Sequence, residues 1–272
     1  MTKQKISIIT CTFNSEKYLD QCISSVARQT YGNVEHVFVD GQSTDKTVSI
    51  IKKYYQQPIL KVEAPLGIYN ALNHGLTLAT GDIVGLLHSD DLFYDENCLA
   101  RIADCFENDD RLAYYCAKMI IYDKQLVKPY AILGSAPHKQ TLRDQLYSST
   151  YFAHPTYYLR KETLAVLGGY DETYRIAADI DWLFRLERLN LKFYFDDKPL
   201  IKFRASGESA KKYFFALKEE FTIRRKLEGI STALLLVYAY HFFRRSVRFI
   251  LEALGLGKTV AFSRKLLLKI RT

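Results

Sequence analysis

The chain begins with short apolar runs that recur roughly every 25 residues, the repeat length of successive βα units. The runs are Ile6–Thr10, Val34–Asp40, Leu60–Glu63 and Ile83–Leu87. Between the first two, apolar residues recur at helical spacing from Tyr18 to Val26, behind Asn14 and Ser15, which can cap a helix. Strands that are apolar on both faces belong to a parallel sheet covered by helices. The sequence therefore predicts an α/β fold with a mostly parallel, Rossmann-like sheet flanked by helices.

The composition is that of a folded protein with reduced thiols. Of the 272 residues, 48% are hydrophobic, enough for one large domain with or without an appendage. The N-terminal MTKQKISIIT contains no apolar stretch long enough for a signal peptide, so we expect the body of the chain to stay in the cytoplasm. The cysteines are odd in number and include no CxxC pair, which favours buried thiols over disulfides or a zinc site.

Positive charge is concentrated at the C-terminal end. The net charge is +8, yet residues 211–272 alone carry fourteen Lys and Arg against four Asp and Glu, so residues 1–210 are slightly acidic. A basic tail can meet nucleic acid, anionic lipid or solvent, and charge alone does not choose among them.

Polar and acidic residues follow the predicted strands at the edge where ligands bind in such sheets. They are Cys11 to Asn14, Asp40 to Asp45, Glu63 and His88 to Asp91. Any one of these residues can be a turn or a helix cap, and capping is the favoured role for Ser43 to Asp45. Asp90 and Asp91 are adjacent, and two like charges side by side need either solvent or a cation between them.

A second acidic pair precedes a helical pattern near residue 180. In AADIDWLFRL, Asp179 and Asp181 come just before an apolar helix face that begins at Trp182. This spacing predicts both carboxylates at or near the N-terminal end of a helix, where they can act as caps or face a ligand.

Five segments, in this order and at this spacing, resemble the family-2 glycosyltransferases with the GT-A fold, especially those that build bacterial surface polysaccharides. The resemblance covers about the first 205 residues through SIITCTFNS, VEHVFVDGQSTDKT, GIYNALNHGLTLATGDIVGLLHSDD, GGYDE and AADIDWLFRL. It implies transfer of a sugar from a nucleotide-diphosphate donor to a glycan or lipid-linked acceptor, by one in-line displacement with inversion.

The resemblance implies a donor site at the ends of the first strands. Thr12, Phe13 and Asn14 would wrap the base, and Asp40 would accept a hydrogen bond from its ring N–H. Uracil and guanine offer that N–H, so UDP-sugars are favoured and GDP-sugars are possible. Asn73 packs near the donor or is only a structural hydrogen bonder.

The resemblance also implies a metal and a base. Asp90 would be the first ligand of Mg²⁺ or Mn²⁺, and Asp91 would bind the metal or shape the site. His88 replaces the first aspartate of the family's Asp-x-Asp motif, where it would contact the ribose or a water, or make a structural hydrogen bond. Asp179 would be the base that takes the acceptor proton, with Asp181 as the alternative.

The predicted organisation is a GT-A domain over residues 1–209 and a basic amphipathic helical tail over residues 210–272. Residues 1–111 would form the nucleotide-sugar half and residues 112–209 the acceptor half. Within the junction Phe203–Ala210, a linker is favoured over a mobile loop that carries Arg204 near the phosphates.

The tail is expected either to lie on the cytoplasmic membrane surface or to pack on the body. Ile230–Phe243 is uncharged and, as a helix, spans about 21 Å, too short for the roughly 30 Å bilayer core. Downstream, apolar and basic residues alternate as far as Phe262–Arg271, as in interfacial helices. Docking would place the enzyme at the inner face of the membrane beside a lipid-linked acceptor.

Two other classes remain open. A sugar nucleotidyltransferase would carry a Gly-rich phosphate loop with basic residues after the first strand, and TCTFNS has none. A non-catalytic membrane-surface or nucleic-acid binding protein would explain the tail but not the acidic residues gathered at one edge of the sheet. We therefore expect no nucleic-acid partner.

Overall fold

The computed structural model describes residues 3–137, 153–205 and 213–253. Its N-terminal half is a parallel sheet in the order β3-β2-β1-β4, with a helix after each of the first three strands. These elements are β1 (Ile6–Thr12), α1 (Glu16–Ala27), β2 (Val34–Asp40), α2 (Thr47–Tyr54), β3 (Ile59–Val62), α3 (Ile68–Leu78) and β4 (Ile83–Leu86). The predicted βα alternation is confirmed.

The second half extends the same sheet with mixed strands. The elements are β5 (Leu92–Phe93), α4 (Cys98–Glu107), β6 (Tyr114–Tyr122), β7 (Pro129–Leu133), η1 (His154–Thr156), β8 (Tyr158–Arg160), α6 (Lys161–Leu167), α7 (Ala178–Arg188) and β9 (Phe193–Arg204). The order continues β4-β8-β6-β9-β5, in which β8 is antiparallel to both neighbours while β6 and β9 are parallel. Short β8 therefore joins the parallel strands of the first half to the parallel pair β6 and β9, while β5 and β7 pair antiparallel with β9 and β6.

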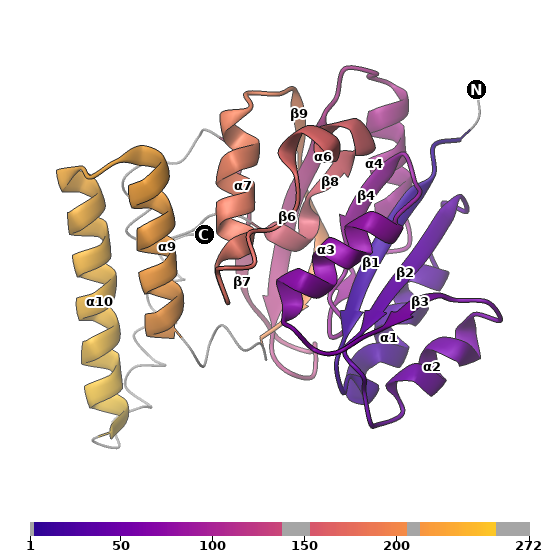
Figure 1. The fold of residues 1–272 in the computed structure, drawn as a ribbon, viewed down its shortest axis with the longest axis horizontal. Coiled ribbons are helices and arrows are strands. Elements are labelled where there is room, and N and C mark those ends of the chain that lie inside the picture. Colours follow the sequence, from indigo (N-terminus) through magenta and orange to yellow (C-terminus); the bar gives the residue numbers. More distant parts are fainter. Residues whose placement is uncertain (1–2, 138–152, 206–212, 254–272) are drawn as a thin grey trace.

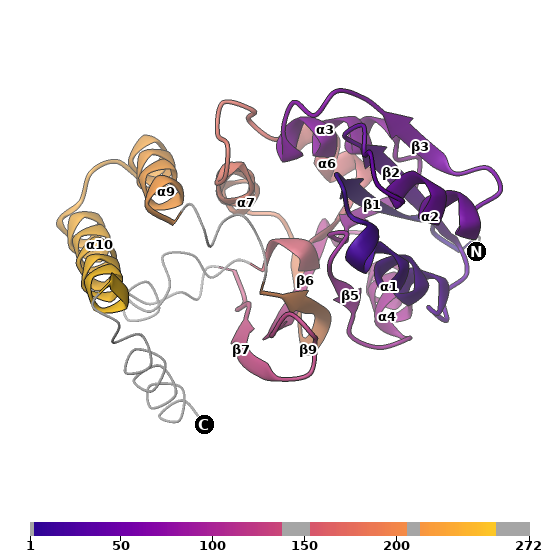
Figure 2. The same ribbon diagram turned by 90° about the horizontal axis from the view of Figure 1, so that it is seen from below.

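Helices cover both faces of the sheet (Figure 2). Ile8 of β1 packs in a core with residues of α1 and α4, whereas its neighbour Ile9 packs in a second core with residues of α3, α6 and α7. The predicted double burial is thus confirmed for β1. It is wrong for β3, an edge strand where Ile59 and Val62 are exposed. This strand also ends at Val62, one residue earlier than predicted.

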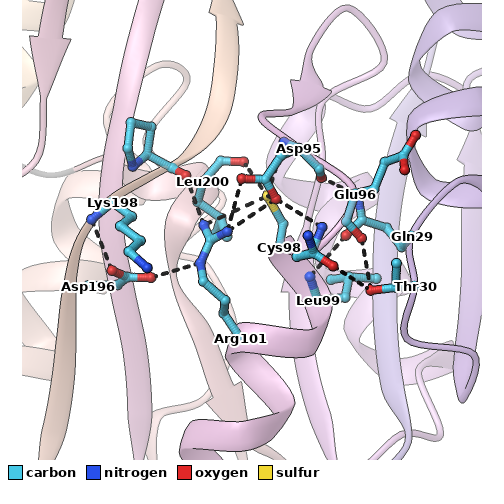
Figure 3. Close-up of polar contacts among 12 residues, drawn as sticks. Gln29, Thr30, Asp95, Glu96, Cys98, Leu99, Arg101, Asp196, Lys198 and Leu200 are labelled. Atoms are coloured by element: carbon cyan, nitrogen blue, oxygen red, sulfur yellow. Dashed lines mark hydrogen bonds and ion pairs between the residues drawn. The ribbon is translucent and has the colours of Figure 1, made fainter.

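An arginine network fastens β9 to α4 (Figure 3). Arg101 donates from Nε to Asp196 at 3.0 Å and from Nη1 to Asp95 at 3.1 Å. Asp196 also accepts a hydrogen bond from the buried Tyr115 hydroxyl at 2.7 Å. These bonds fix the start of the long strand β9, and the other end of that strand reaches the site described below.

The tail begins as a helical hairpin of α9 (Tyr213–Glu228) and α10 (Thr232–Ala253). Helix α9 lies against α7, and α10 packs on α9 as the outermost described element (Figure 1). Leu217 of α9 and Leu234, Val237 and Tyr238 of α10 form its apolar contact. Across the described ranges, no helix is both long enough and apolar enough to span a bilayer. The predicted segment Phe262–Arg271 lies outside the described residues.

The structure corrects two local predictions. Phe203 and Arg204 are not linker residues, because they end β9. Ala205 follows them and donates its N–H to the Tyr122 carbonyl at 3.1 Å, and residues 206–210 of the predicted linker lie outside the described residues. Ser15 is the N-cap residue of α1. Its hydroxyl, however, accepts a hydrogen bond from the Phe13 N–H and not from an N–H of the helix. All five cysteine thiols are free, and those of Cys22, Cys98 and Cys116 are buried.

Candidate active site

The Asp40 carboxylate lies at the end of β2 and is fully buried. One oxygen accepts hydrogen bonds from the Thr12 hydroxyl at 2.7 Å and the Ser43 hydroxyl at 2.6 Å, and the other accepts from the Ser43 N–H at 2.8 Å. Because Thr12 and Asp40 are register partners of β1 and β2, the two strands deliver these groups side by side. The bonds hold Asp40 in place at the carboxyl edge of the sheet.

The loop after β1 is fastened to the loop after β2 through Asn14. This residue adopts a left-handed conformation, with φ of 47°, which asparagine tolerates better than most residues. Its Oδ1 accepts from the Thr44 N–H at 2.9 Å, and its own N–H donates to the Ser43 hydroxyl at 2.8 Å. The neighbouring Phe13 is 58% exposed, so an apolar ring faces solvent at this edge.

The role expected for Ser43 to Asp45 as helix caps is found at Asp45 alone. Its carboxylate accepts the N–H of Thr47, the first residue of α2, at 2.9 Å, and the N–H of Glu16, the first residue of α1, at 3.1 Å. Asp45 therefore fixes the starts of both helices, whereas Ser43 donates hydrogen bonds to Asp40.

The His88–Asp91 turn follows β4 and joins the same edge. The Ser89 hydroxyl lies 3.1 Å from that of Ser15, which links the turn to the loop after β1. Asp91 is fully buried and accepts the Arg204 N–H at 2.8 Å through Oδ1, while Oδ2 has no hydrogen-bond partner among the described residues. Burial and the charge of Asp90 raise the pKa of Asp91, whereas burial lowers the pKa of His88.

Arg204 holds the His88–Asp91 turn through hydrogen bonds to Asp90 and Asp91. It is almost fully buried, and its Nε donates to the Asp90 carbonyl at 2.9 Å. The guanidinium also donates to Gln21 at 3.0 Å and stacks 3.9 Å from the ring centroid of Tyr18. Small residues after Arg204 suggested a linker in the sequence, and burial of the arginine was not predictable from that pattern.

Asp179 lies in the first turn of α7, as predicted. Its Oδ1 is 3.0 Å from the hydroxyl of Tyr69, which also lies 2.5 Å from the Ile176 carbonyl oxygen. Burial raises the pKa of Asp179 to about 6. A carboxylate with such a pKa is ionised at neutral pH and is a stronger base than an ordinary aspartate.

Asp181 lies in the same turn but is engaged elsewhere. Its buried carboxylate forms an ion pair with Arg185 at 2.8 Å, one helical turn later. This carboxylate is therefore occupied by a side chain of its own helix. The geometry therefore favours Asp179 over Asp181 as a base.

Asn73 clamps the loop before α7 onto α3. Its amide donates to the Tyr170 carbonyl at 3.0 Å and accepts the Tyr170 N–H at 2.7 Å. A methyl group at Gly169 would lie 2.5 Å from the Asn73 Oδ1, so glycine leaves space for this clamp. The structure thus gives Asn73 the structural hydrogen bonds that the sequence left as one of its two possible roles.

Tyr69 was missed in the sequence. It lies four residues before Asn73, hence on the same face of α3, and both residues bond to the chain around α7. The i, i+4 spacing of the two polar side chains was the signal that could have identified it.

The His154 side chain lies between His88 of the turn after β4 and the aromatic residues Tyr170 and Trp182. Its Nε2 is 2.9 Å from the Tyr170 hydroxyl, and its ring lies 6.0 Å from that of Trp182 and 6.5 Å from that of His88. Burial lowers the pKa of His154 to about 3, so the imidazole is neutral. These contacts give His154 a structural role.

The predicted residues fall into two groups. The donor-side group lies in loops joined by hydrogen bonds at the carboxyl edge of the sheet and comprises Thr12, Phe13, Asn14, Asp40, His88, Asp90 and Asp91. Asp179 and Asn73 belong to the second group, where α3 meets α7. Among the described residues, no cluster of three or more His, Cys, Asp or Glu side chains is arranged to hold a metal ion.

Comparison with known proteins agrees with this architecture. The chain is 29% identical over 189 residues to a PGL/p-HBAD biosynthesis glycosyltransferase of Mycobacterium tuberculosis, covering 68% of this chain and 70% of that protein. It is similar in fold to S. aureus TarS in complex with UDP-GlcNAc, with a TM-score of 0.64 and 24% identity over 81% of this chain. The match covers 64% of the TarS chain, slightly less than two thirds.

A second solved structure shares the fold at lower identity. It is the mannosyltransferase PcManGT from Pyrobaculum calidifontis in complex with GDP-Man and Mn²⁺, with a TM-score of 0.60 and 16% identity over 89% of this chain and 70% of that chain. The family model described as glycosyl transferase family 2 matches residues 7–167. The fold is GT-A, and the chain belongs to glycosyl transferase family 2.

Proposed function

We propose that the protein moves a sugar from a nucleotide-diphosphate donor to a hydroxyl of a glycan or lipid-linked acceptor, with inversion, in the assembly of a bacterial surface polysaccharide. The observation that carries the proposal is Asp179, a partly buried carboxylate whose pKa is raised to about 6 and which Tyr69 orients. In the reaction the acceptor oxygen bonds to the anomeric carbon, the bond from that carbon to the diphosphate breaks, and Asp179 takes the hydroxyl proton.

The donor would occupy the edge formed by the loops after β1, β2 and β4. Exposed Phe13 offers a surface on which a base can stack, and Asp40 supplies a carboxylate held in place at the end of β2. A UDP-sugar is favoured and a GDP-sugar is possible. The complexes of TarS with UDP-GlcNAc and of PcManGT with GDP-Man support the two options.

The residues of the turn fit a divalent cation. Asp90 would hold Mg²⁺ or Mn²⁺, with Asp91 behind it, whose buried Oδ2 lacks a hydrogen-bond partner among the described residues. Such cations are often held by one or two carboxylates and completed by substrate phosphates and water. The bound cation would stabilise the negative charge of the departing diphosphate.

A thermal-shift screen tests this function. At a concentration about 100 times Kd, a ligand that binds only the folded state stabilises it by about 2.7 kcal/mol, which raises the Tm of a chain of this length by about 5 °C. We expect that shift from a UDP-sugar with Mn²⁺, and a smaller shift without the metal. UDP-glucose, UDP-GlcNAc and GDP-mannose are suitable probes, with ATP as the control nucleotide. No response to any nucleotide sugar would favour the non-catalytic binding protein instead.

We also propose that α10 rests on the cytoplasmic face of the membrane. Leu234, Val237, Tyr238 and His241 face the hairpin interior, yet the other side of the helix is also apolar. Its exposed residues include Leu235, Leu236, Tyr240, Phe242, Phe243, Val247 and Ile250. The first part of α10, up to Phe243, is uncharged on all sides, and such a helix needs a further partner. The sequence continues into many basic residues over 244–271, which anionic lipid headgroups attract.

Vesicle sedimentation tests this docking. The full chain should co-sediment with vesicles that contain anionic phospholipid, and less so at high salt. Introducing Leu236→Glu and Phe243→Glu together should weaken binding by about tenfold or more, because two apolar contacts become charged. Val166→Glu is the matched control, since Val166 is 72% exposed on α6, away from the tail. Equal sedimentation of all three chains would contradict the docking of α10.

A further inference from the structure

We infer that Glu219 of α9 is a positioning residue for the base Asp179, so that the tail helix forms part of the catalytic machinery; this inference rests on the proposed function. No feature of the sequence indicates this role. Glu219 is one of several charged residues on an amphipathic helix, where such side chains are usually solvated.

The Glu219 carboxylate accepts three consecutive backbone N–H groups. Its Oε1 is 2.9 Å from the nitrogen of Arg175, and its Oε2 is 2.9 Å from that of Ile176 and 3.1 Å from that of Ala177. These residues lead directly into α7, whose first residue is Ala178. The N–H groups at a helix start need partners from outside the helix, and a carboxylate there is favoured by the helix dipole.

The same segment carries the group that orients the base. The Ile176 N–H bonds to Glu219, and the Ile176 carbonyl faces the Tyr69 hydroxyl, which is also the hydrogen-bond partner of Asp179. Glu219 therefore holds one side of the peptide segment and Tyr69 the other. Ala177 accepts the N–H groups of Ile180 and Asp181, so its position sets the first turn of α7. A shift of the segment would displace Asp179.

The negative charge of Glu219 also favours Asp179 as a base, because it contributes to the raised pKa of that carboxyl group. Asp179 faces Tyr69 from α3, Tyr170 from the loop before α7 and Glu219 from α9, while Asp181 on α7 itself is paired with Arg185. Both tyrosines are neutral at physiological pH, because burial raises their pKa values. The Glu219 charge adds to burial in raising the pKa of Asp179. Its loss should therefore lower that pKa.

Helix α9 is held in place for this task. Beyond Glu219, the Arg188 side chain at the end of α7 donates to the Leu227 carbonyl, and Arg224 lies 5.7 Å from the ring of Phe184. The two helices are thus bonded at both ends of α7. Glu219 therefore lies on a helix that is held against α7 by several contacts.

The test is Glu219→Gln in the full chain, assayed for sugar release from the nucleotide donor that the thermal-shift screen identifies. The amide keeps the shape but loses the charge and presents N–H groups to backbone donors. We expect kcat to fall about tenfold with an unchanged donor KM, because the base is displaced while the donor site is untouched. The acidic limb of kcat/KM against pH should move to lower pH.

Two further variants sharpen the test. Glu228→Gln makes the same chemical change on the same helix, but Glu228 pairs with Arg224 and not with the segment before α7, so its pH profile should match the wild type. Glu219→Asp keeps the charge but shortens the reach, so it should lose turnover while its acidic limb stays near that of the wild type.

The outcomes separate the two proposals. If the wild type releases sugar and Glu219→Gln has the same kcat and pH profile, the positioning role is wrong while the proposed function stands. The positioning role is also wrong if Glu219→Gln and Glu228→Gln lose activity equally without moving the acidic limb. A wild type that binds and cleaves no nucleotide sugar would overturn the proposed function and, with it, the role of Glu219.

Discussion

Replacing Asp179 with Asn is expected to lower turnover by about 10² or more, because the variant keeps the shape of the side chain but cannot take the acceptor proton. Donor binding should survive, since the residues proposed to bind the nucleotide lie in the loops after β1, β2 and β4. The measurement is steady-state transfer, with donor affinity determined separately by calorimetry.

The pH profile provides a second readout for the same variant. The pKa of Asp179 is raised to about 6, so the base becomes protonated as the pH falls through that value. In the wild type, kcat/KM should therefore be constant near neutrality and fall about tenfold per pH unit below about 6. This limb should be absent from the residual activity of Asp179→Asn.

Asp181→Asn is the matched control, because it makes the same change two residues away in the same helical turn. We expect it to weaken the ion pair with Arg185, and thus to affect stability more than turnover. If Asp181→Asn lost the turnover and Asp179→Asn retained it, the base would be Asp181.

The second large effect is expected at the metal. Asp90→Ala should remove the Mn²⁺-dependent part of donor binding and lower kcat/KM by about 10² or more, since the negative diphosphate would lose its counter-charge. Calorimetry of UDP binding with and without Mn²⁺ measures the first effect. The control is Asp110→Ala, an exposed carboxylate in the loop before β6, at the opposite edge of the sheet. Unchanged metal dependence in Asp90→Ala would rule out this residue as the ligand.

The strands of the first half could be predicted because burial acts on each of them locally. β1, β2 and β4 are covered on both faces, are buried at nearly every position and are therefore rich in apolar residues. Edge strand β3 lacks that cover, and Ile59 and Val62 are exposed there. β8 has only three residues, too few for any periodicity, so its antiparallel place between β4 and β6 follows from tertiary packing alone.

The candidate site could be predicted where a residue lies next to a recognisable strand or helix end. Asp40, Asp90 and Asp179 all fall in such places. Arg204 and Glu219 do not, because their contacts join residues more than 40 positions apart. A single sequence contains no local signal for such contacts. For that reason the arginine was assigned to a linker and the glutamate was not singled out.

The bonds between α7 and α9 bear on how such enzymes could be recombined. A chimaera that joins this body to the tail of a relative at residue 209 would exchange α9, and with it the carboxylate that binds the segment before α7. The turn at Gly229, between α9 and α10, is a better junction, because the contacts of α10 with α9 are mostly apolar and can be repacked. In this protein the interchangeable module begins one helix later than the change in composition indicates.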